Sequence, residues 1–317
     1  MSEAARAADA AMGHEAVAAV DVGGTRIKAA LVDRSGRELV STTVPTPHLG
    51  MPGALVAAVA GTVEMLQQAG AEQGRSVRVA GAGVVVPGLV DDARGVAVFS
   101  ANLGWRDLEV VAPLESVLGV PVALGHDVRA GLLAEVRWGA ARGAENAMFV
   151  PLGTGIAGAL MVDGRVLHGS GYAGELGHVQ VEPAGPRCGC GAFGCLEAVS
   201  SAAAIERAYA QRCGLDAPVG ADTVAALVSQ GDPAATEVWA GAVSALARAV
   251  VMAVTLTGVD LVLVGGGLAQ SGDLLLEPLR REVAAALTFQ RPPTLVRAAL
   301  GDRAGCLGAA CLAWDLT

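Results

Sequence analysis

The sequence predicts an α/β protein built from two related halves. Short apolar segments with strand character alternate with longer segments whose apolar residues recur at helical spacing. A strand, a glycine-rich turn and a second strand occur over 21–33 and again over 150–163, with Gly23 aligned on Gly153. With 317 residues, 53% of them apolar, the chain is long enough to bury two cores.

Each half reads as a regular series of elements. In the first half we expect a helix over 51–70 and strands over 15–22, 27–33, 38–44 and 76–86. In the second half we expect helices over about 197–211 and 233–257, and strands over 147–153, 156–164 and 260–266. The segment 164–192 reads as loop, and a last helix is expected over about 304–314.

The charge balance and the apolar runs argue against two classes of partner. The chain has 31 acidic and 22 basic residues, and its net charge of −9 argues against nucleic-acid binding, which normally needs a basic face. The longest apolar runs, such as 249–259, fall well short of the ~20 residues that span a membrane. Charged residues interrupt the alanine-rich start, so we expect no signal peptide and a cytoplasmic protein with reduced thiols.

The first glycine-rich turn carries the residues of a candidate phosphate site. A strand delivers Asp21 to its end, and Gly23 and Gly24 allow backbone N–H groups to face an anion. Thr25 adds a hydroxyl donor, and Lys28, the only lysine in the chain, adds a positive charge. The pattern matches neither the P-loop nor the Rossmann fingerprint. A glycine-rich hairpin turn without a ligand explains this motif equally well.

Two further glycine-rich turns lie in the second half. They consist of Gly153, Thr154 and Gly155, and of Gly265, Gly266, Gly267 and Leu268. Glycine at the carboxyl end of a strand permits close approach of a flat or bulky ligand. Three such turns, two of them related by the repeat, favour one nucleotide bound between two domains.

The loop-rich segment contains a set of metal-binding residue types. Within 18 residues the chain offers one imidazole and three thiols, from His178, Cys188, Cys190 and Cys195. This set fits a closed, structural zinc site of tetrahedral geometry, and sulfur ligands favour zinc over Mg²⁺. The alternative, three unligated thiols in one loop, would be vulnerable to oxidation.

Carboxylates flank the predicted zinc loop. Glu175 precedes His178 by three residues, and Glu197 follows Cys195 by two. A zinc-bound loop would hold both carboxylates and the imidazole rigidly, which suits a ligand with several hydroxyl groups. A solvated loop carboxylate is the alternative for each. Asp127 lies at a predicted helix start, where its position alone favours an N-cap.

Three segments together resemble the ROK family of sugar kinases and regulators. They are DVGGTRIK at 21–28, LGTGIAGALMVDG at 152–164 with GSGYAGELGHVQVEP at 169–183, and CGCGAFGCLEAV at 188–199. The resemblance runs from about Val17 to Trp314 and implies two actin/hexokinase-like (ribonuclease-H-like) domains around a central cleft, with a zinc-binding loop. The last helix would return to the first domain. The expected organisation is then a mobile tail over 1–15, a small N-terminal α/β domain over 16–124 plus 303–317, and a large C-terminal α/β domain over 125–302.

The resemblance also implies roles for individual residues. Asp127 resembles the catalytic base that faces the 6-hydroxyl of a hexose. The residues that would bind the sugar are Gly88, Asn102, His126, Asp127, Glu175, His178 and Glu197. The residues that would hold ATP are Gly23, Gly24, Thr25, Lys28, Gly153, Thr154, Gly155, Gly265, Gly266, Gly267 and Leu268, with Asp21 holding Mg²⁺ through water. His178 would use one ring nitrogen for zinc and the other for the sugar.

One position departs from the family pattern. Family kinases commonly carry Asn directly before the catalytic Asp, facing the middle of the sugar ring, whereas this chain has His126. Glucose remains the leading substrate, but the departure at His126 makes an amino or N-acetylated hexose, such as kanosamine, N-acetylglucosamine or N-acetylmannosamine, the alternative. The resemblance implies ATP with Mg²⁺ as donor and a homodimer or homotetramer, with no nucleic-acid or membrane partner.

Three non-kinase functions are alternatives. A ROK-type repressor needs a helix-turn-helix domain ahead of Asp21, and we expect none in the 20 residues that precede it. A sugar-binding protein with the kinase fold but no turnover would need neither Asp127 nor the phosphate turns. A structural zinc protein with incidental glycine turns leaves the repeat unexplained.

Overall fold

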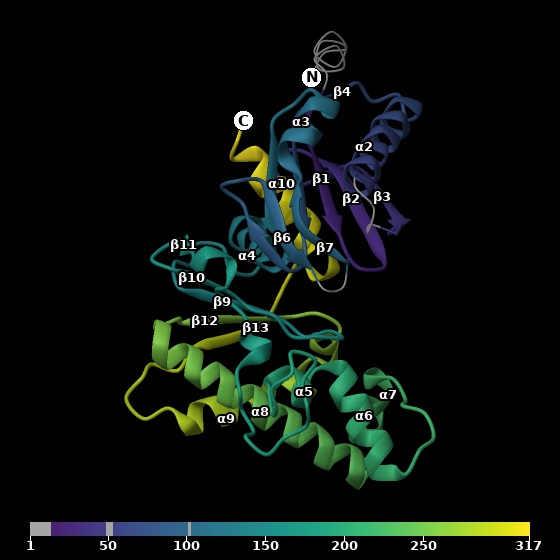
Figure 1. The fold of residues 1–317 in the computed structure, drawn as a ribbon. Helices are drawn as coiled ribbons and strands as arrows, with labels where there is room; N and C mark the ends of the chain where they lie inside the picture. The colour runs from purple at the N-terminus through teal and green to yellow at the C-terminus, as the bar shows by residue number, and fades with distance from the viewer. Residues whose placement is uncertain (1–13, 49–52, 101–102) are drawn as a thin grey trace, which may run out of the picture. The chain divides into compact units, whose positions relative to one another are not determined.

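The computed structural model describes residues 14–48, 53–100 and 103–317 (Figure 1). Contacts divide the chain into two compact units, Met1–Trp138 with Asp302–Thr317, and Gly139–Gly301. The first unit reaches Trp138, beyond the expected boundary at 124, because the helix that begins at Asp127 packs against the last helix of the chain. Residues 14 and 15 of the expected tail belong to the first strand, and the rest of that tail lies outside the described residues.

The first unit is built on a five-stranded sheet with the order β3-β2-β1-β4-β8. An antiparallel meander forms one side, and β1, β4 and β8 run parallel. These strands are β1 (His14–Val22), β2 (Arg26–Val32), β3 (Glu38–Pro45), β4 (Val77–Val86) and β8 (Val122–His126). A smaller sheet contains β5 (Leu89–Asp91), β6 (Val96–Ser100) and β7 (Trp105–Glu109). The helices are α2 (Ala54–Glu72), α3 (Val111–Leu118), α4 (Asp127–Trp138) and α10 (Ala304–Trp314).

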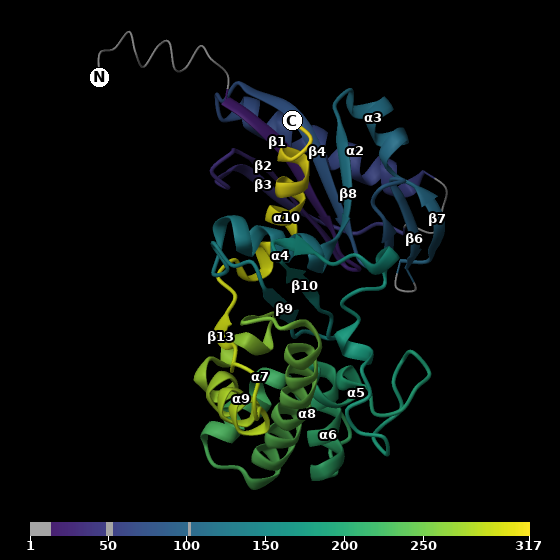
Figure 2. The same cartoon turned by 90° about the vertical axis from the view of Figure 1, so that its left-hand side faces the viewer.

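Helices α2 and α10 cover opposite faces of the larger sheet (Figure 2). Large side chains fill the α2 face, where Leu66 shares a buried cluster with Val84. The α10 face is lined by small residues, so the helix backbone comes very close to the strands. At Gly83 of β4, a Cβ would overlap the carbonyl oxygen of Ala309. The absence of a side chain therefore sets the distance between α10 and the sheet.

The second unit repeats this topology with the order β11-β10-β9-β12-β13. Again three strands form an antiparallel meander, and β9, β12 and β13 run parallel. These strands are β9 (Ala147–Pro151), β10 (Ala159–Val162), β11 (Arg165–Val166), β12 (Leu261–Gly265) and β13 (Thr294–Arg297). The shared strand order confirms the internal repeat that the two glycine-rich motifs predict.

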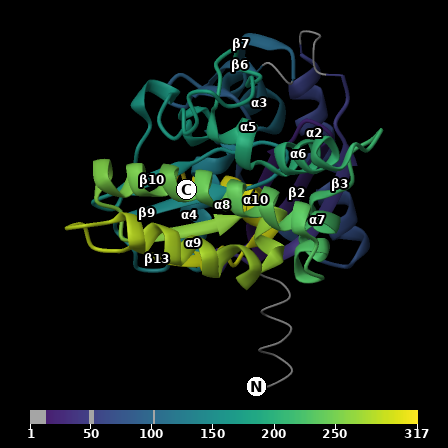
Figure 3. The same cartoon turned by 90° about the horizontal axis from the view of Figure 1, so that it is seen from below.

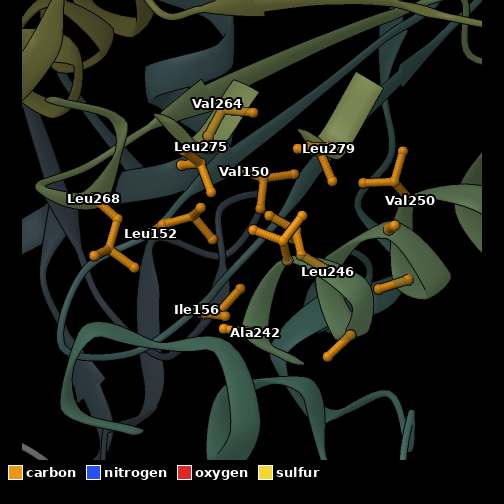
Figure 4. Close-up of a cluster of buried hydrophobic side chains, with 14 of the residues drawn as sticks. Val150, Leu152, Ile156, Ala242, Leu246, Val250, Val264, Leu268, Leu275 and Leu279 are labelled. Atoms are coloured by element: carbon orange, nitrogen blue, oxygen red, sulfur yellow. The ribbon is translucent and has the colours of Figure 1, made fainter. Parts of the chain in front are cut away.

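Five α-helices accompany this second sheet in the described chain. They are α5 (Leu196–Ser200), α6 (Ala202–Cys213), α7 (Ala221–Ser229), α8 (Pro233–Thr257) and α9 (Asp273–Ala286). Helices α8 and α9 lie side by side across one face of the sheet (Figure 3). Leu246 of α8 and Leu279 of α9 belong to the buried cluster that also holds Val150 and Val264 of the strands (Figure 4). This cluster is the core of the second unit.

Within the described residues, α8 is the one helix whose length and apolar composition would allow it to cross a membrane. In its most apolar window, 56% of the residues are buried inside the protein. Its buried residues belong to the core of the second unit. Packing in this core therefore accounts for the apolar character of α8.

The helix expected over about 197–211 is two helices separated at Ser201. This residue is extended, with φ −70° and ψ 161°, and its side chain accepts a hydrogen bond from the Ala204 N–H at 3.1 Å. An N-cap of this kind starts a new helix rather than continuing the previous one. Helices α3, α7 and α9 and the β5–β7 sheet are further elements that the sequence analysis did not predict.

We expect Gly83→Ala to destabilise the protein by about 1–3 kcal/mol, because the added Cβ would force α10 away from the sheet. Gly61→Ala in α2 is the matched control, since nothing lies within 4 Å of a Cβ at that position. Replacing a helical glycine there should stabilise the protein by about 0.5–1 kcal/mol. Chemical denaturation of both variants measures the difference. Equal stability of the two variants would show that the close approach of α10 is not required.

Candidate active site

Parallel strands bring the predicted residues of the first unit to one edge of its sheet. Asp21 lies one residue before the end of β1, and Gly88 follows β4. His126 is the last residue of β8, and Asp127 begins α4 directly after it. In α/β proteins, ligands bind outside the carboxyl ends of parallel strands. The sheet thus gathers residues that are far apart in sequence at the edge where a ligand site is expected.

Asp21 is held among groups that change the pKa of its carboxyl. This pKa is raised to about 6, because burial and the charge of Asp302 raise it by more than the charge of Lys28 lowers it. The first turn of α10 lies against the same carboxylate, because a Cβ at Gly305 would be 2.5 Å from Asp21 Oδ2. The close packing of α10 therefore fixes the surroundings of Asp21.

Asp127 combines access with an elevated pKa. Its side chain is 32% exposed, so a ligand can reach it. Its pKa is raised to about 7, chiefly by removal from water and then by the negative charge of Asp21. The Val128 N–H, which donates to Asp127 Oδ1 at 2.8 Å, and the charge of Arg129 act in the opposite direction. A carboxylate with a pKa near 7 is suited to accept a proton from a hydroxyl group at neutral pH.

His126 is a neutral imidazole whose Nδ1 lies 3.3 Å from Asp127 Oδ1. Its Nδ1 accepts hydrogen bonds from the N–H groups of Val128 at 3.2 Å and Arg129 at 3.5 Å, at the start of α4. An acceptor Nδ1 places the ring proton on Nε2. Burial, followed by the charge of Arg129, lowers the pKa of His126 to about 3. The side chain therefore offers a ligand one hydrogen-bond donor, Nε2–H, and no positive charge.

The first glycine-rich turn is a closed hairpin between β1 and β2. The Gly23 N–H donates to the Arg26 carbonyl at 3.0 Å, and Thr46 Oγ1 donates to the Gly23 carbonyl at 2.7 Å. The Gly23 N–H is therefore used inside the turn. Gly24 and Thr25 lie at its exposed tip, and the space beside Gly24 is open. These two residues are the part of the predicted phosphate turn that a ligand can reach.

Lys28 makes a contact that the sequence did not predict. Its Nζ donates to the carbonyl oxygen of Asp302 at 2.8 Å and to Asp302 Oδ2 at 3.1 Å. The two residues are 274 positions apart, so no local pattern could identify the pair. Asp302 directly precedes Arg303 and the last helix, and its position before a helix was the one available signal. The ion pair aligns the Lys28 ammonium beside Asp21.

Gly88 and Asn102 are the other two residues of the first unit in the predicted sugar-binding set. Gly88 has a φ of 100°, and a Cβ there would overlap the carbonyl oxygen of Phe99, so the turn after β4 requires glycine. Asn102 lies outside the described residues.

The structure joins the two glycine-rich turns of the second unit. The Leu152 N–H donates to the Gly265 carbonyl at 2.9 Å, and the Leu268 N–H donates to the Leu152 carbonyl at 3.2 Å. Gly153, Thr154 and Gly155 therefore lie beside the turn that contains Gly266 and Gly267. Leu152 and Leu268 are buried in the core, which anchors both turns (Figure 4).

A pocket of about 390 Å³ opens beside these turns, which is within the range of small-molecule sites. Its lining residues come from α6, α7 and the turn after β12: Ala202, Glu206, Ala221, Asp222, Ala225, Gly267, Leu268, Gln270 and Ser271. Glu206 and Asp222 give this pocket carboxylate acceptors. The sequence analysis identified Gly267 and Leu268, but no local motif marks the residues from α6 and α7.

The predicted zinc ligands form one compact cluster. One ligand atom from each of His178, Cys188, Cys190 and Cys195 lies within 4.8 Å of all the others. His178 Nδ1 is 3.7 Å from Cys188 Sγ, and Cys190 Sγ is 3.7 Å from Cys195 Sγ. Zn–S bonds of 2.3 Å in a tetrahedron place sulfur atoms about 3.8 Å apart, so the donor set fits zinc.

The two flanking carboxylates have different surroundings. Glu175 Oε2 is 4.0 Å from His178 Nε2, on the ring side opposite the zinc ligands. Glu197 Oε2 instead accepts a hydrogen bond from the Ile156 N–H at 2.9 Å. Glu197 thus contacts the segment that follows the Gly153–Gly155 turn, a contact that sequence spacing did not predict.

Comparisons with curated proteins find sugar kinases over nearly the whole chain. The chain is 33% identical to a glucokinase of Streptomyces coelicolor, covering 93% of this chain and 96% of the relative. It is 32% identical to an N-acetylmannosamine kinase of Salmonella arizonae, covering 93% and 97%.

Two solved structures that resemble this chain are also sugar kinases. A ROK hexokinase from Thermus thermophilus superposes with a TM-score of 0.80 at 36% identity, covering 95% of this chain and 98% of that chain. A ROK family glucokinase from Streptomyces griseus, in complex with glucose and AMPPNP, has a TM-score of 0.79 at 29% identity, with 95% and 99% covered. These relatives confirm the actin/hexokinase-like fold. The ROK family model matches residues 17–315, and the chain belongs to the ROK family.

Proposed function

We propose that the protein is an ATP-dependent kinase that phosphorylates the 6-hydroxyl of glucose or a close glucose analogue. The observation that carries this proposal is Asp127, an accessible carboxylate with a pKa near 7 at the carboxyl edge of the sheet. Relatives named glucokinase, similar over nearly the full length, support the same activity. A carboxylate in this state is suited to activating a sugar hydroxyl.

In the proposed reaction, Asp127 orients the 6-hydroxyl and accepts its proton as the oxygen attacks the γ-phosphorus and ADP leaves in line. Bound Mg²⁺ neutralises charge on the β- and γ-phosphates. Asp21 would hold that ion through water. The exposed turn at Gly24 and Thr25, with Lys28, faces the phosphates.

The second unit supplies the remaining nucleotide contacts in this proposal. The turn over Gly153–Gly155 contacts phosphate, and the pocket beside Gly265–Leu268 receives the nucleoside. The family resemblance assigns sugar binding to Glu175, His178 and Glu197 of the second unit and to Gly88, Asn102 and His126 of the first. Zinc on His178, Cys188, Cys190 and Cys195 is structural, because all four ligands come from the protein.

An N-acetylated hexose is the second candidate substrate, favoured by the N-acetylmannosamine kinase among the relatives. An acetamide carbonyl could accept the hydrogen bond that His126 Nε2–H donates. In either case we propose a cytoplasmic homodimer or homotetramer that acts on small molecules.

We expect Asp127→Asn to lower kcat by roughly 10²–10⁴-fold, since the general base is lost while the side-chain shape is kept. Binding of AMPPNP with Mg²⁺ should be unchanged. Asp216→Asn, an exposed carboxylate between α6 and α7, is the control and should retain full activity. Coupled measurement of ADP release gives kcat for all three proteins. An Asp127→Asn enzyme with near wild-type kcat would remove Asp127 from the role of base.

We expect kcat/KM to rise with pH through a midpoint near 7, because the Asp127 carboxyl must lose its proton to act as a base. In Asp21→Asn the midpoint should move to lower pH, since the neighbouring charge that raises the pKa of Asp127 is gone. His126→Asn should leave the midpoint in place, because the pKa of His126 is about 3. Profiles of log(kcat/KM) against pH test this, and an unmoved midpoint in Asp21→Asn would contradict it.

Among hexoses, we expect glucose to be phosphorylated at least about tenfold more efficiently than kanosamine in its ammonium form. An ammonium placed at His126 would meet a donor instead of an acceptor, and an unpaired buried polar group costs about 1–3 kcal/mol. His126→Asn restores an acceptor and should reduce this ratio. A panel that includes N-acetylglucosamine and N-acetylmannosamine identifies the preferred substrate. A wild-type preference for kanosamine would contradict the assigned tautomer, and no turnover on any sugar would favour the non-catalytic alternative.

A further inference from the structure

The peptide group of Ile156 is held from two sides. On one side its N–H donates to Glu197 Oε2 at 2.9 Å. On the other side its carbonyl oxygen packs so closely against Gly177 that a Cβ there would overlap it. Ile156 itself is 5% exposed and belongs to the core of the second unit. The chain therefore cannot shift at Ile156 without disturbing both neighbours.

Glu197 and Gly177, the two neighbours of Ile156, are each close in sequence to a predicted zinc ligand. Glu197 is two residues after Cys195, in the first turn of α5, and Gly177 is immediately before His178. Backbone pairing connects the two segments, since the Leu196 N–H donates to the Val179 carbonyl at 2.9 Å. A metal ion bound by both His178 and Cys195 would link the two sides at a second point.

Ile156 lies directly after the glycine-rich turn formed by Gly153, Thr154 and Gly155. Leu152 and Ile156 form an antiparallel bridge that closes the turn, and the Ala202 N–H donates to the Gly153 carbonyl at 2.9 Å. Glu197 is packed directly onto the turn, because a Cβ at Gly155 would lie 2.5 Å from Glu197 Oε2. The shape of the turn therefore depends on where this carboxylate lies.

We propose that Glu197 is a positioning residue for the nucleotide, and that zinc occupancy sets nucleotide affinity through the hydrogen bond from Ile156 to Glu197. This inference rests on the proposed function, in which the Gly153–Gly155 turn contacts phosphate. Glu197 then has two tasks: Oε2 fixes the turn, while Oε1 remains for the sugar. Zinc, by joining the segments of His178 and Cys195, keeps the carboxylate in place.

The conservative variant separates this role from sugar binding. Glu197→Gln keeps a carbonyl oxygen that can accept from the Ile156 N–H, whereas Glu197→Ala removes the acceptor. Without sugar, we expect the Kd of AMPPNP with Mg²⁺, measured by titration calorimetry, to rise roughly 5- to 50-fold in Glu197→Ala and by less than about threefold in Glu197→Gln. A residue that only binds sugar would leave this Kd unchanged in both variants.

A second pair of variants tests the packing of the carboxylate on the turn. Gly155→Ala should weaken AMPPNP binding, because its Cβ would displace Glu197 Oε2. Gly241→Ala in α8 is the control, since nothing lies within 4 Å of a Cβ there, and its Kd should equal that of wild type. Equal Kd values for Gly155→Ala and wild type would count against the proposal.

The link to zinc is tested by a double perturbation. Zinc content is measured by elemental analysis, and zinc is then removed with a chelator from wild type and from Glu197→Ala. Removal should raise the Kd of AMPPNP in wild type and change it little in Glu197→Ala, because the two perturbations break the same connection. Independent, multiplicative effects would overturn the link to zinc. If the stripped protein unfolds, as circular dichroism would show, the comparison of Glu197→Ala with Glu197→Gln still decides the role of Glu197.

Failure of this inference and failure of the proposed function give different results. If wild-type protein binds neither AMPPNP nor glucose, the proposed kinase function is wrong and the inference falls with it. If wild type binds AMPPNP but Glu197→Ala binds it equally well, the kinase function stands and the role of Glu197 in nucleotide binding is wrong.

Discussion

Close backbone contact at positions without side chains is the constraint on which much of this structure depends. In the first unit, α10 reaches the sheet because Gly83 leaves room for its backbone. The same approach places Gly305 against Asp21 and therefore determines the surroundings of a proposed Mg²⁺-binding carboxylate. In the second unit, Gly177 allows a segment of the zinc loop to contact Ile156. A protein with 43 glycines can place its backbone where side chains would otherwise prevent contact.

Burial and nearby charges shift the pKa values of three neighbouring side chains, Asp21, Asp127 and His126, at the edge of the first sheet. Burial raises the pKa values of Asp21 and Asp127, and each pKa is then adjusted by nearby charges. Burial has the opposite effect on His126, where it favours the neutral ring. The result is one carboxylate suited to proton transfer, one suited to a hydrated cation, and one uncharged donor. Residues that share a low-polarity environment thus acquire distinct chemical roles.

The proposed zinc site lies close to the Ile156 segment of the second unit. Cys195 lies two residues before Glu197, and His178 lies directly after Gly177. Glu197 and Gly177 contact the Ile156 peptide group at its N–H and at its carbonyl oxygen. Zinc bound in a tetrahedral site would hold Cys195 and His178 at set distances from each other, one or two residues from these contacts. In the proposed arrangement, Glu197 is the residue that connects the metal site to the glycine-rich turn.

Features that depend on short-range patterns could be predicted from the amino-acid sequence. Helix α8, helix α10, the repeated strand–turn–strand motif and the four clustered zinc ligands were predictable because their signals lie within a few residues of one another. The α/β class followed from the alternation of strands and helices, and the family resemblance added the actin/hexokinase-like fold. The pairing of Lys28 with Asp302, the acceptor role of His126 Nδ1 and the contact of Glu197 with Ile156 became visible only in the folded chain. These depend on how strands and helices meet in space, because hydrogen bonds and desolvation act over a few ångströms, whatever the separation along the chain.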